Sequence, residues 1–336
     1  MSKLPVFVGL DYHQSVVQVC VMDASGRVLT NQKCRNDWQT IAEIVPRNHM
    51  VHAAIEACNG AADLADQLVA KAGWSVDLAH AGYVARIKQS PDKTDFGDAQ
   101  LLADLERVGY LPRVWRAPQW IRELRRLVRY RQQLAAQRRR VKLRIRSLLR
   151  DHRLSHGSAA PWTKRWLTWL ASTDQLSCQS RWIMDEHLRE LDELGKRILL
   201  TERKLQEVTA DDSLTQRLQE ERGCGRITSV TIRAEIGRFD RFRSGKQLAR
   251  FCGLSPRNAS SGTRQGDAGV IKAGNPELRR VLTQAAQRLI RYEEHWLKMA
   301  YRMRTSGKAT CVIVAAVANR WMRRLYHDMK EHQLAI

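Results

Sequence analysis

The sequence predicts an α/β domain at the N-terminus, a helical coiled-coil region in the middle and a mostly α-helical domain at the C-terminus. Short β-rich segments alternate with helical segments up to about residue 110, a long basic helical pattern follows Pro118, and the patterns after residue 215 are mostly helical. The expected domains are residues 1–112, 113–212 and 213–336.

The first hundred residues predict a sheet whose later strands are separated by helices. A turn of small and polar residues at 23–26 indicates a hairpin between the second and third strands. Asp95 is expected to cap a helix. Three meandering strands followed by two α/β crossovers give the strand order of an RNase H-like fold. The expected strands are 6–10, 16–22, 27–33, 51–55 and 75–78, and the expected helices are 37–45, 61–72 and 95–107.

Residues 118–153 predict one long helix with a strong positive charge. Apolar residues recur at three- and four-residue spacing, while the other faces carry thirteen cations against two acids. A second helical pattern, at about 182–208, carries both signs of charge. We expect a helical hairpin or coiled coil whose first arm follows a phosphate backbone, rather than an ordinary solvated helix pair. The cations expected to contact nucleic acid are Arg125, Arg129, Arg139, Lys142 and Arg146.

The composition indicates a polyanionic partner. Basic residues outnumber acidic ones by 57 to 35, giving a net charge of +22 and a pI near 10.3. No apolar run is long enough to span a bilayer, and the N-terminus leads into a strand without a signal peptide. The seven cysteines are widely spaced and contain no C-x-x-C pair, which argues against a disulfide framework or a zinc knuckle. We expect a protein of the reducing cytoplasm.

Four acids in this basic chain predict a metal site. Asp11 and Glu56 end the first and fourth strands, which are neighbours in an RNase H-like sheet, and Asp95 and Asp98 share one face of a helix. Carboxylates held together repel each other unless a cation such as Mg2+ lies between them. The set could hold one or two Mg2+, about 4 Å apart if both bind. Taken singly, each acid could instead be a turn cap, a helix cap or an exposed side chain.

A serine loop and a glycine turn stand out in the last third of the chain. Gly223-Cys224-Gly225 running into a helix is similar to a helix-hairpin-helix turn, although a tight turn explains the glycines equally well. The loop contains Ser260-Ser261-Gly262. A serine hydroxyl here is a candidate nucleophile, and the two adjacent serines leave open which of them it is. Nearby cations could clamp a phosphate and favour a serine alkoxide. These cations are Arg257, Arg264 and Lys272.

These motifs, in this order, resemble the transposases of the IS110 insertion-sequence family, which are RNA-guided bridge recombinases related to the Piv DNA invertases. The resemblance covers nearly the whole chain. It is carried by Gly9-Leu10-Asp11, Ile55-Glu56-Ala57, Lys93-Thr94-Asp95-x-x-Asp98-Ala99, Gly253-Leu254-Ser255-Pro256-Arg257, Ser261-Gly262 and Lys272-Ala273-Gly274-Asn275.

The resemblance implies a RuvC-like domain whose four carboxylates bind Mg2+, a coiled coil, and a transposase domain with Ser261 as nucleophile. It implies attack on a phosphodiester that leaves a 5′-phosphoserine link and a free 3′-OH. It also implies a structured non-coding guide RNA that pairs with target and donor duplex DNA. The implied assembly is a tetramer of two dimers, with active sites built from two protomers.

Two other functions remain open on the residues alone. A RuvC-type junction nuclease would need the four carboxylates and water, but it would not need Ser261. A non-catalytic nucleic-acid-binding protein would need only the basic arm, and clustered acids would work against its binding of phosphates.

Overall fold

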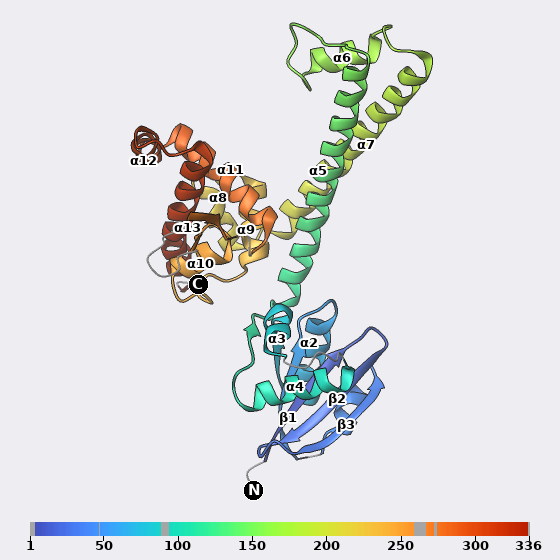
Figure 1. Cartoon of the computed structure of the whole chain (residues 1–336), viewed down its shortest axis with the longest axis vertical. Coiled ribbons are helices and arrows are strands. Elements are labelled where there is room, and N and C mark those ends of the chain that lie inside the picture. Colours follow the sequence, from blue (N-terminus) through green and yellow to red (C-terminus); the bar gives the residue numbers. More distant parts are fainter. Residues whose placement is uncertain (1–3, 47, 89–93, 259–266, 272–273, 335–336) are drawn as a thin grey trace. The chain divides into compact units, whose positions relative to one another are not determined.

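The computed structural model of the chain describes residues 4–46, 48–88, 94–258, 267–271 and 274–334. Two compact units divide the chain, Met1–Gln119 and Trp120–Ile336 (Figure 1). The second unit includes most of the region expected to be a coiled coil and all of the region expected to be a transposase domain. The division into three domains stays a prediction.

The first unit contains a six-stranded mixed sheet in the order β3-β2-β1-β4-β5-β6. The first three strands form an antiparallel meander, β4 and β5 continue the sheet parallel to β1, and β6 pairs antiparallel with β5. All five expected strands are present with small shifts at their ends, and their order is consistent with an RNase H-like fold. The strands are β1 (Pro5–Tyr12), β2 (Val16–Asp23), β3 (Val28–Arg35), β4 (Met50–Glu56), β5 (Ser75–Ala79) and β6 (Arg113–Val114).

Helices cover both faces of this sheet. Val8 and Leu10 of β1 face a core that includes residues of α1 (Trp38–Ile44) and α2 (Ala61–Ala72). The opposite face packs against α4 (Asp95–Arg107). The alternation along each strand separates the two cores, because successive side chains point to opposite faces.

The third predicted helix is confirmed, but its cap is different from the prediction. Thr94 has an extended backbone, and its side-chain hydroxyl accepts a hydrogen bond from the Gly97 N–H at 3.1 Å. Asp95 is therefore the first residue inside α4, and the prediction that it caps the helix is wrong. The structure also contains α3 (Ala81–Ile87) and the two-residue β6, neither of which the sequence patterns predicted.

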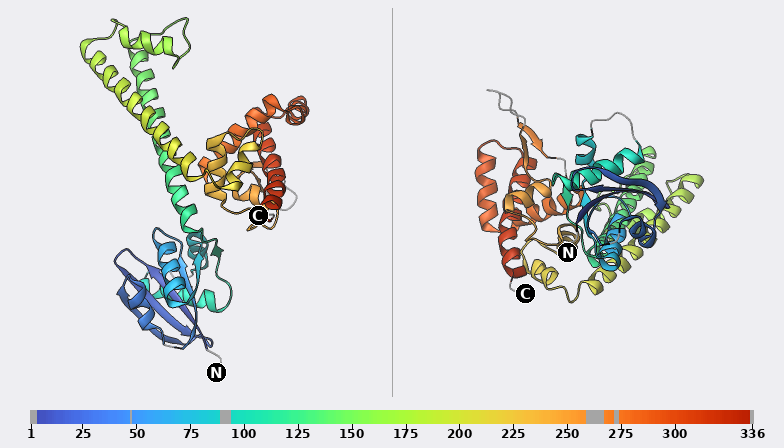
Figure 2. Two further views of the ribbon diagram at one scale, coloured as in Figure 1. Left: turned by 180° about the vertical axis from the view of Figure 1, so that it is seen from behind. Right: turned by 90° about the horizontal axis from the view of Figure 1, so that it is seen from below.

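The second unit begins with the expected helical hairpin. In both Figures 1 and 2, α5 (Gln119–Asp151) and α7 (Cys178–Val208) lie side by side along much of their length, and α6 (Lys164–Ser172) lies near the end of the hairpin where they are connected. All three helices contribute to one apolar core, which holds the hairpin together. Buried members of this core include Leu134, Val141, Ile145, Leu170, Met184, Leu194 and Ile198.

The rest of the second unit is mostly helical, as predicted. A core of apolar side chains, centred on residues such as Phe239, Leu282 and Trp321, joins its helices. Two short strands, β7 (Pro256–Asn258) and β8 (Asp267–Val270), form a hairpin. The helices are α8 (Ser213–Glu220), α9 (Arg226–Ile236), α10 (Gly245–Phe251), α11 (Pro276–Tyr292), α12 (Glu294–Thr305) and α13 (Thr310–Leu334).

Within the described residues, no helix has the length and apolar character needed to cross a bilayer. The seven cysteines all lie in this described part of the chain, and each is a free thiol.

Candidate metal centre and active site

Two strands bring Asp11 and Glu56 to the same edge of the sheet. β1 and β4 are parallel neighbours, with Gly9 opposite Ala54, so the two acids follow at equivalent positions near the strand ends. Gly9 faces α4, and Ala54 belongs to the core beneath that helix. Because side chains alternate along a strand, Asp11 and Glu56 lie on this same α4 face.

The first turn of α4 brings two more acids to this edge. Asp95 and Asp98 lie at the helix N-terminus, where the helix dipole favours negative charge. The Asn31 side-chain amide on β3 donates a hydrogen bond to the Phe96 carbonyl at 3.1 Å, which ties the start of α4 to the sheet. The joint role of the four acids in binding a metal stays a prediction.

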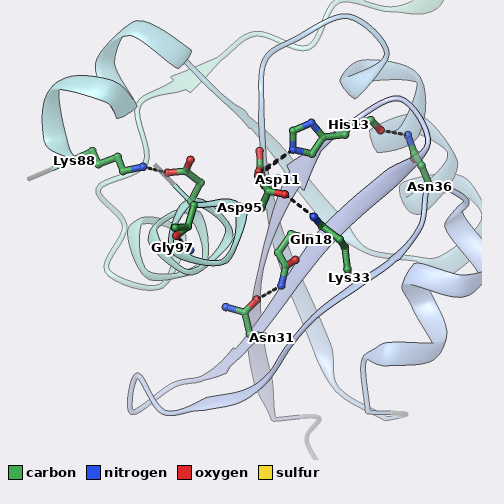
Figure 3. A network of polar contacts seen from close by, with 11 residues as sticks. Asp11, His13, Gln18, Asn31, Lys33, Asn36, Lys88, Asp95 and Gly97 are labelled. Atoms are coloured by element: carbon green, nitrogen blue, oxygen red, sulfur yellow. Dashed lines mark hydrogen bonds and ion pairs between the residues drawn. The ribbon is translucent and has the colours of Figure 1, made fainter. Parts of the chain in front are cut away.

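The His13 imidazole lies beside both Asp11 and Asp95 (Figure 3). Its Nε2 atom is 3.3 Å from Asp11 Oδ2 and 3.4 Å from Asp95 Oδ1. Among the described residues, these three form a group that could hold a metal ion, because their potential ligand atoms all lie within 4.8 Å of one another. Glu56 and Asp98 do not belong to this close group.

Two lysines contact the acids of α4. Lys33 Nζ is 2.7 Å from Asp95 Oδ2 (Figure 3). Lys88 forms an ion pair with Asp98. The strand register explains the first contact, because Asp11 pairs with Gln18 on β2 and Gln18 pairs with Lys33 on β3. Lys33 therefore extends from the same row across the sheet as Asp11.

The two central carboxyl groups have opposite pKa shifts. Burial raises the pKa of Asp11, the charges of Asp95 and Asp98 raise it further, and His13 opposes them without reversing the shift. The Lys33 hydrogen bond holds the pKa of Asp95 below its usual value, with a smaller contribution from His13. Burial is therefore the main cause of the raised pKa of Asp11, and the neighbouring carboxylates add to it.

This donor set fits a divalent cation. Carboxylate oxygens are hard ligands suited to Mg2+, and an imidazole nitrogen can join them at a mixed site. Asp98 is close enough to act electrostatically on Asp11, and both Glu56 and Asp11 act on the thiol of Cys58. Asp11 and Asp95 thus form the centre, with Asp98 and Glu56 at its margins.

Sequence reasoning missed three residues of this site, which are His13, Lys33 and Lys88. His13 had a detectable signal, because it comes two residues after Asp11 and continues the alternation of β1. Lys33 could have been found only from the register of the β2–β3 hairpin. Lys88 follows α3, which the sequence did not predict.

The expected nucleophile lies outside the described residues. The segment 259–266, which contains Ser260, Ser261 and Arg264, connects β7 to β8, and Lys272 also lies outside the described part. Arg257 is described and exposed on β7. The roles predicted for these residues stay predictions.

The five cations predicted on α5 fall into different environments. Arg125 donates hydrogen bonds to the Ala234 carbonyl at 2.6 Å and the Glu235 carbonyl at 3.2 Å. Arg129 binds the Glu235 carboxylate with two bonds of 3.1 Å each. These two arginines hold α5 against α9, and their role in phosphate binding stays a prediction.

The other three cations lie farther along α5. Arg139 and Arg146 are exposed and seven residues apart, so they lie on one side of the helix. Lys142 lies over the Trp162 ring, with Nζ 4.5 Å from the ring centroid. The exposed pair therefore offers the freest approach to a phosphate backbone among the five predicted cations.

The glycine turn connects α8 to α9. Gly223 has φ of +84°, and an added Cβ would meet the Leu289 side chain at 3.0 Å, so both conformation and packing favour glycine. Gly225 is the N-cap of α9. Contact of this turn with a phosphate stays a prediction.

Comparison with known proteins links both ends of the chain to transposases. A model of the DEDD transposase domain of IS110, described as "Transposase", matches residues 8–153. A second model, described as "Transposase IS116/IS110/IS902 family", matches residues 215–302. The first matched range contains the four acids, and the second contains the serine loop.

Relatives agree with these matches. The transposase for insertion sequence element IS1111A of Coxiella burnetii is 26% identical over 318 residues, covering 91% of this chain and 85% of the relative. A Pseudomonas aeruginosa protein named "Probable family 20 transposase" is 27% identical and covers 95% of both chains. Over these ranges the chain is therefore similar to transposases of the IS110/IS116 family.

Proposed function

We propose that the chain is a Mg2+-dependent DNA transposase or site-specific recombinase that exchanges strands through a 5′-phosphoserine intermediate. The observation that carries the proposal is the convergence of Asp11, His13 and Asp95 at one edge of the N-terminal sheet. The net charge of +22 and the transposase matches support a nucleic-acid substrate. The strand order supports an RNase H-like, RuvC-like domain.

The four carboxylates would hold one or two Mg2+. When bound, the metal neutralises a phosphate oxygen and stabilises the leaving 3′ oxygen. Clustered acids repel a phosphate backbone, so a bound metal would favour the binding of DNA at this edge. The four carboxylates are those of Asp11, Glu56, Asp95 and Asp98.

Ser261 would be the nucleophile of the strand exchange. Its Oγ forms a bond to the scissile phosphorus while the bond from phosphorus to the 3′ oxygen breaks, and the serine proton ends on that oxygen as a 3′-OH. The phosphoserine keeps the energy of one phosphodiester, so the 3′-OH of the partner duplex can displace Ser261 without an external energy source. Arg257, Arg264 and Lys272 would clamp the phosphate and favour the serine alkoxide.

The family resemblance supports the proposed partners. We propose target and donor duplex DNA as substrates and a structured non-coding bridge RNA as the guide that pairs with both. A tetramer of two dimers would build each active site from the RuvC-like domain of one protomer and the serine loop of another. The reaction would take place on nucleoid DNA in the bacterial cytoplasm.

A covalent-trapping assay tests the proposal. The purified protein is incubated with Mg2+, its flanking non-coding RNA and labelled duplex DNA from the ends of the element, and it is then denatured. We expect label to migrate with the protein, to be lost in Ser261→Ala and Asp11→Asn, and to persist in Ser260→Ala. The neighbouring serine is the matched control.

Each alternative gives a different result in this assay. Cleaved DNA without an adduct, unchanged in Ser261→Ala, would establish a hydrolytic nuclease that uses water. Adduct loss in Ser260→Ala alone would move the nucleophile by one residue. DNA binding with neither cleavage nor adduct would support a non-catalytic nucleic-acid-binding protein.

A further inference from the structure

His13 is placed at the candidate metal centre by the fold. Its backbone N–H donates a hydrogen bond to the Val16 carbonyl at 3.0 Å, and its own carbonyl accepts one from the Asn36 side chain at 2.8 Å. These bonds fix the turn between β1 and β2 (Figure 3). The imidazole therefore extends from an anchored backbone rather than from a free loop.

The imidazole reaches both central carboxylates. Nε2 lies 3.3 Å from an Asp11 oxygen and 3.4 Å from an Asp95 oxygen, and the potential ligand atoms of the three side chains lie within 4.8 Å of one another. The His13 side chain is 48% exposed, so the imidazole is not sealed inside the fold. Two oxygen donors and one nitrogen donor thus converge on a small, accessible volume.

A nitrogen donor changes which cations a site prefers. Mg2+ favours oxygen ligands and gives up its water reluctantly, whereas imidazole suits first-row transition metals. Lys33 and Lys88 already supply positive charge to Asp95 and Asp98. Those two acids therefore already have lysine partners, and the His13 imidazole can serve as a metal ligand.

We propose that His13 is a nitrogen ligand of the divalent-metal centre and that it makes this centre bind Mn2+ in preference to Mg2+. The inference rests on the metal centre of the proposed function and adds to it a ligand outside the four carboxylates. In this arrangement the nitrogen bonds directly to the metal, and Asp11 and Asp95 supply oxygen ligands.

Metal binding to the full chain, measured without nucleic acid, tests the inference. Isothermal titration gives the Kd for Mn2+ and for Mg2+, and pulsed electron paramagnetic resonance detects nitrogen bonded to Mn2+. In His13→Asn we expect the Mn2+ Kd to rise about tenfold or more, the Mg2+ Kd to change much less, and the nitrogen signal to disappear. His52→Asn is the matched control, because His52 stacks on Phe7 in the same sheet.

Isotope labelling provides a test that needs no substitution. In the unmodified protein, 15N-histidine must change the nitrogen modulation of bound Mn2+ if an imidazole is a ligand. Equal changes in both Kd values for His13→Asn, or no nitrogen modulation in the unmodified protein, would overturn the inference.

Asp11→Asn separates this inference from the proposed function. One outcome is that Asp11→Asn loses the binding of both Mn2+ and Mg2+ while His13→Asn keeps the preference of the unmodified chain. The metal centre would then stand, and His13 would not be its ligand. Unchanged binding of both metals in Asp11→Asn would remove the centre itself, and the proposed metal-dependent function with it.

Discussion

The position of the acids depends on a residue without a side chain. A Cβ at position 9 would lie 1.8 Å from the Ala99 carbonyl oxygen and 2.6 Å from the Ala103 nitrogen. α4 can therefore lie directly on β1 only because this residue is glycine. Since α4 carries Asp95, the distance of that acid from Asp11 follows from the contact at Gly9.

Substitution of Gly9 by alanine should therefore disrupt both stability and metal binding. We expect Gly9→Ala to lower the free energy of unfolding by about 1–3 kcal/mol or more, because the backbone of α4 must move. The Mn2+ Kd should rise in the same variant as Asp95 is displaced. Urea unfolding followed by circular dichroism, together with metal titration, measures both effects.

Gly82 provides the matched control within the same unit. An added Cβ there meets the His80 ring at 3.4 Å, an ordinary contact, and the residue lies within the helix α3. Gly82→Ala should leave metal binding unchanged and raise the free energy of unfolding by up to about 1 kcal/mol. Equal effects of the two substitutions would show that α4 does not depend on the close approach at Gly9.

The sequence predicted the acids of the centre but not their neutralising partners. Asp11 and Glu56 were predictable because strand order alone brings the ends of β1 and β4 together. Lys33 depends on the register of two antiparallel pairings, and Lys88 depends on where an unpredicted helix ends. Such contacts follow from tertiary placement, which spacing along the chain does not encode.

At the scale of elements, Asp212 connects two helices of the second unit. Its carboxylate accepts a hydrogen bond from the Thr215 N–H at 3.0 Å and so caps α8. The same carboxylate binds Arg233 of α9 through bonds of 2.8 Å and 2.9 Å. The side chains of this ion pair are only 16% and 10% exposed, so solvent screens their attraction weakly.

The loss of this carboxylate charge should destabilise the second unit in a pH-dependent way. Burial alone would raise the pKa of Asp212, but hydrogen bonds from Arg233 and Thr215 outweigh it and lower the pKa below the ordinary 3.8. Because the folded-state pKa is the lower one, the stabilisation is complete above the unfolded-state value and is lost as pH falls through the folded-state value. At pH 7, Asp212→Asn should lower the free energy of unfolding by about 3–5 kcal/mol.

Urea unfolding at pH 7 and near pH 2 checks this sign. The difference in the free energy of unfolding between Asp212→Asn and the unmodified chain should shrink at the lower pH, where the carboxyl group becomes protonated. Asp192→Asn is the control, because its pair with Lys196 is 67% and 71% exposed and solvent screens it, so its loss should change the free energy of unfolding little. A difference that stays constant with pH would mean that the charge of Asp212 does not stabilise the fold.

Long elements were predictable and short ones were not. α5 agrees with its predicted range because many turns repeat the same apolar spacing. α12 was missed because Glu293, which is extended, separates it from α11, and it buries only Trp296, Met299 and Ala300. α10 has only 7 residues, too few for a periodic pattern to be distinguished from a loop.

At the scale of the whole molecule, the net charge of +22 predicts a polyanionic partner but does not say which cations reach it. The structure divides the predicted α5 cations by environment. Arg125 donates hydrogen bonds to carbonyls of α9, and Arg129, although exposed, donates both of its bonds to Glu235 of α9. Arg139 and Arg146 are exposed farther along α5. Spacing along a helix gives the face of a residue, but only the packing of another helix determines which cations on that face are paired with it.

The salt dependence of DNA binding should distinguish these two groups. Each phosphate contact releases counterions, so the double variant Arg139→Gln, Arg146→Gln should reduce the slope of log K against log salt by about 2 and weaken binding to all sequences alike. Fluorescence anisotropy of a labelled duplex across a series of NaCl concentrations measures this slope. The matched variant is Arg129→Gln, which removes the bidentate contact with Glu235 and should lower thermal stability while leaving the slope unchanged. A reduced slope in Arg129→Gln, with an unchanged slope in the double variant, would instead place the DNA along the α9 side of α5. Only a cation that contacts phosphate in the complex can change the number of counterions released.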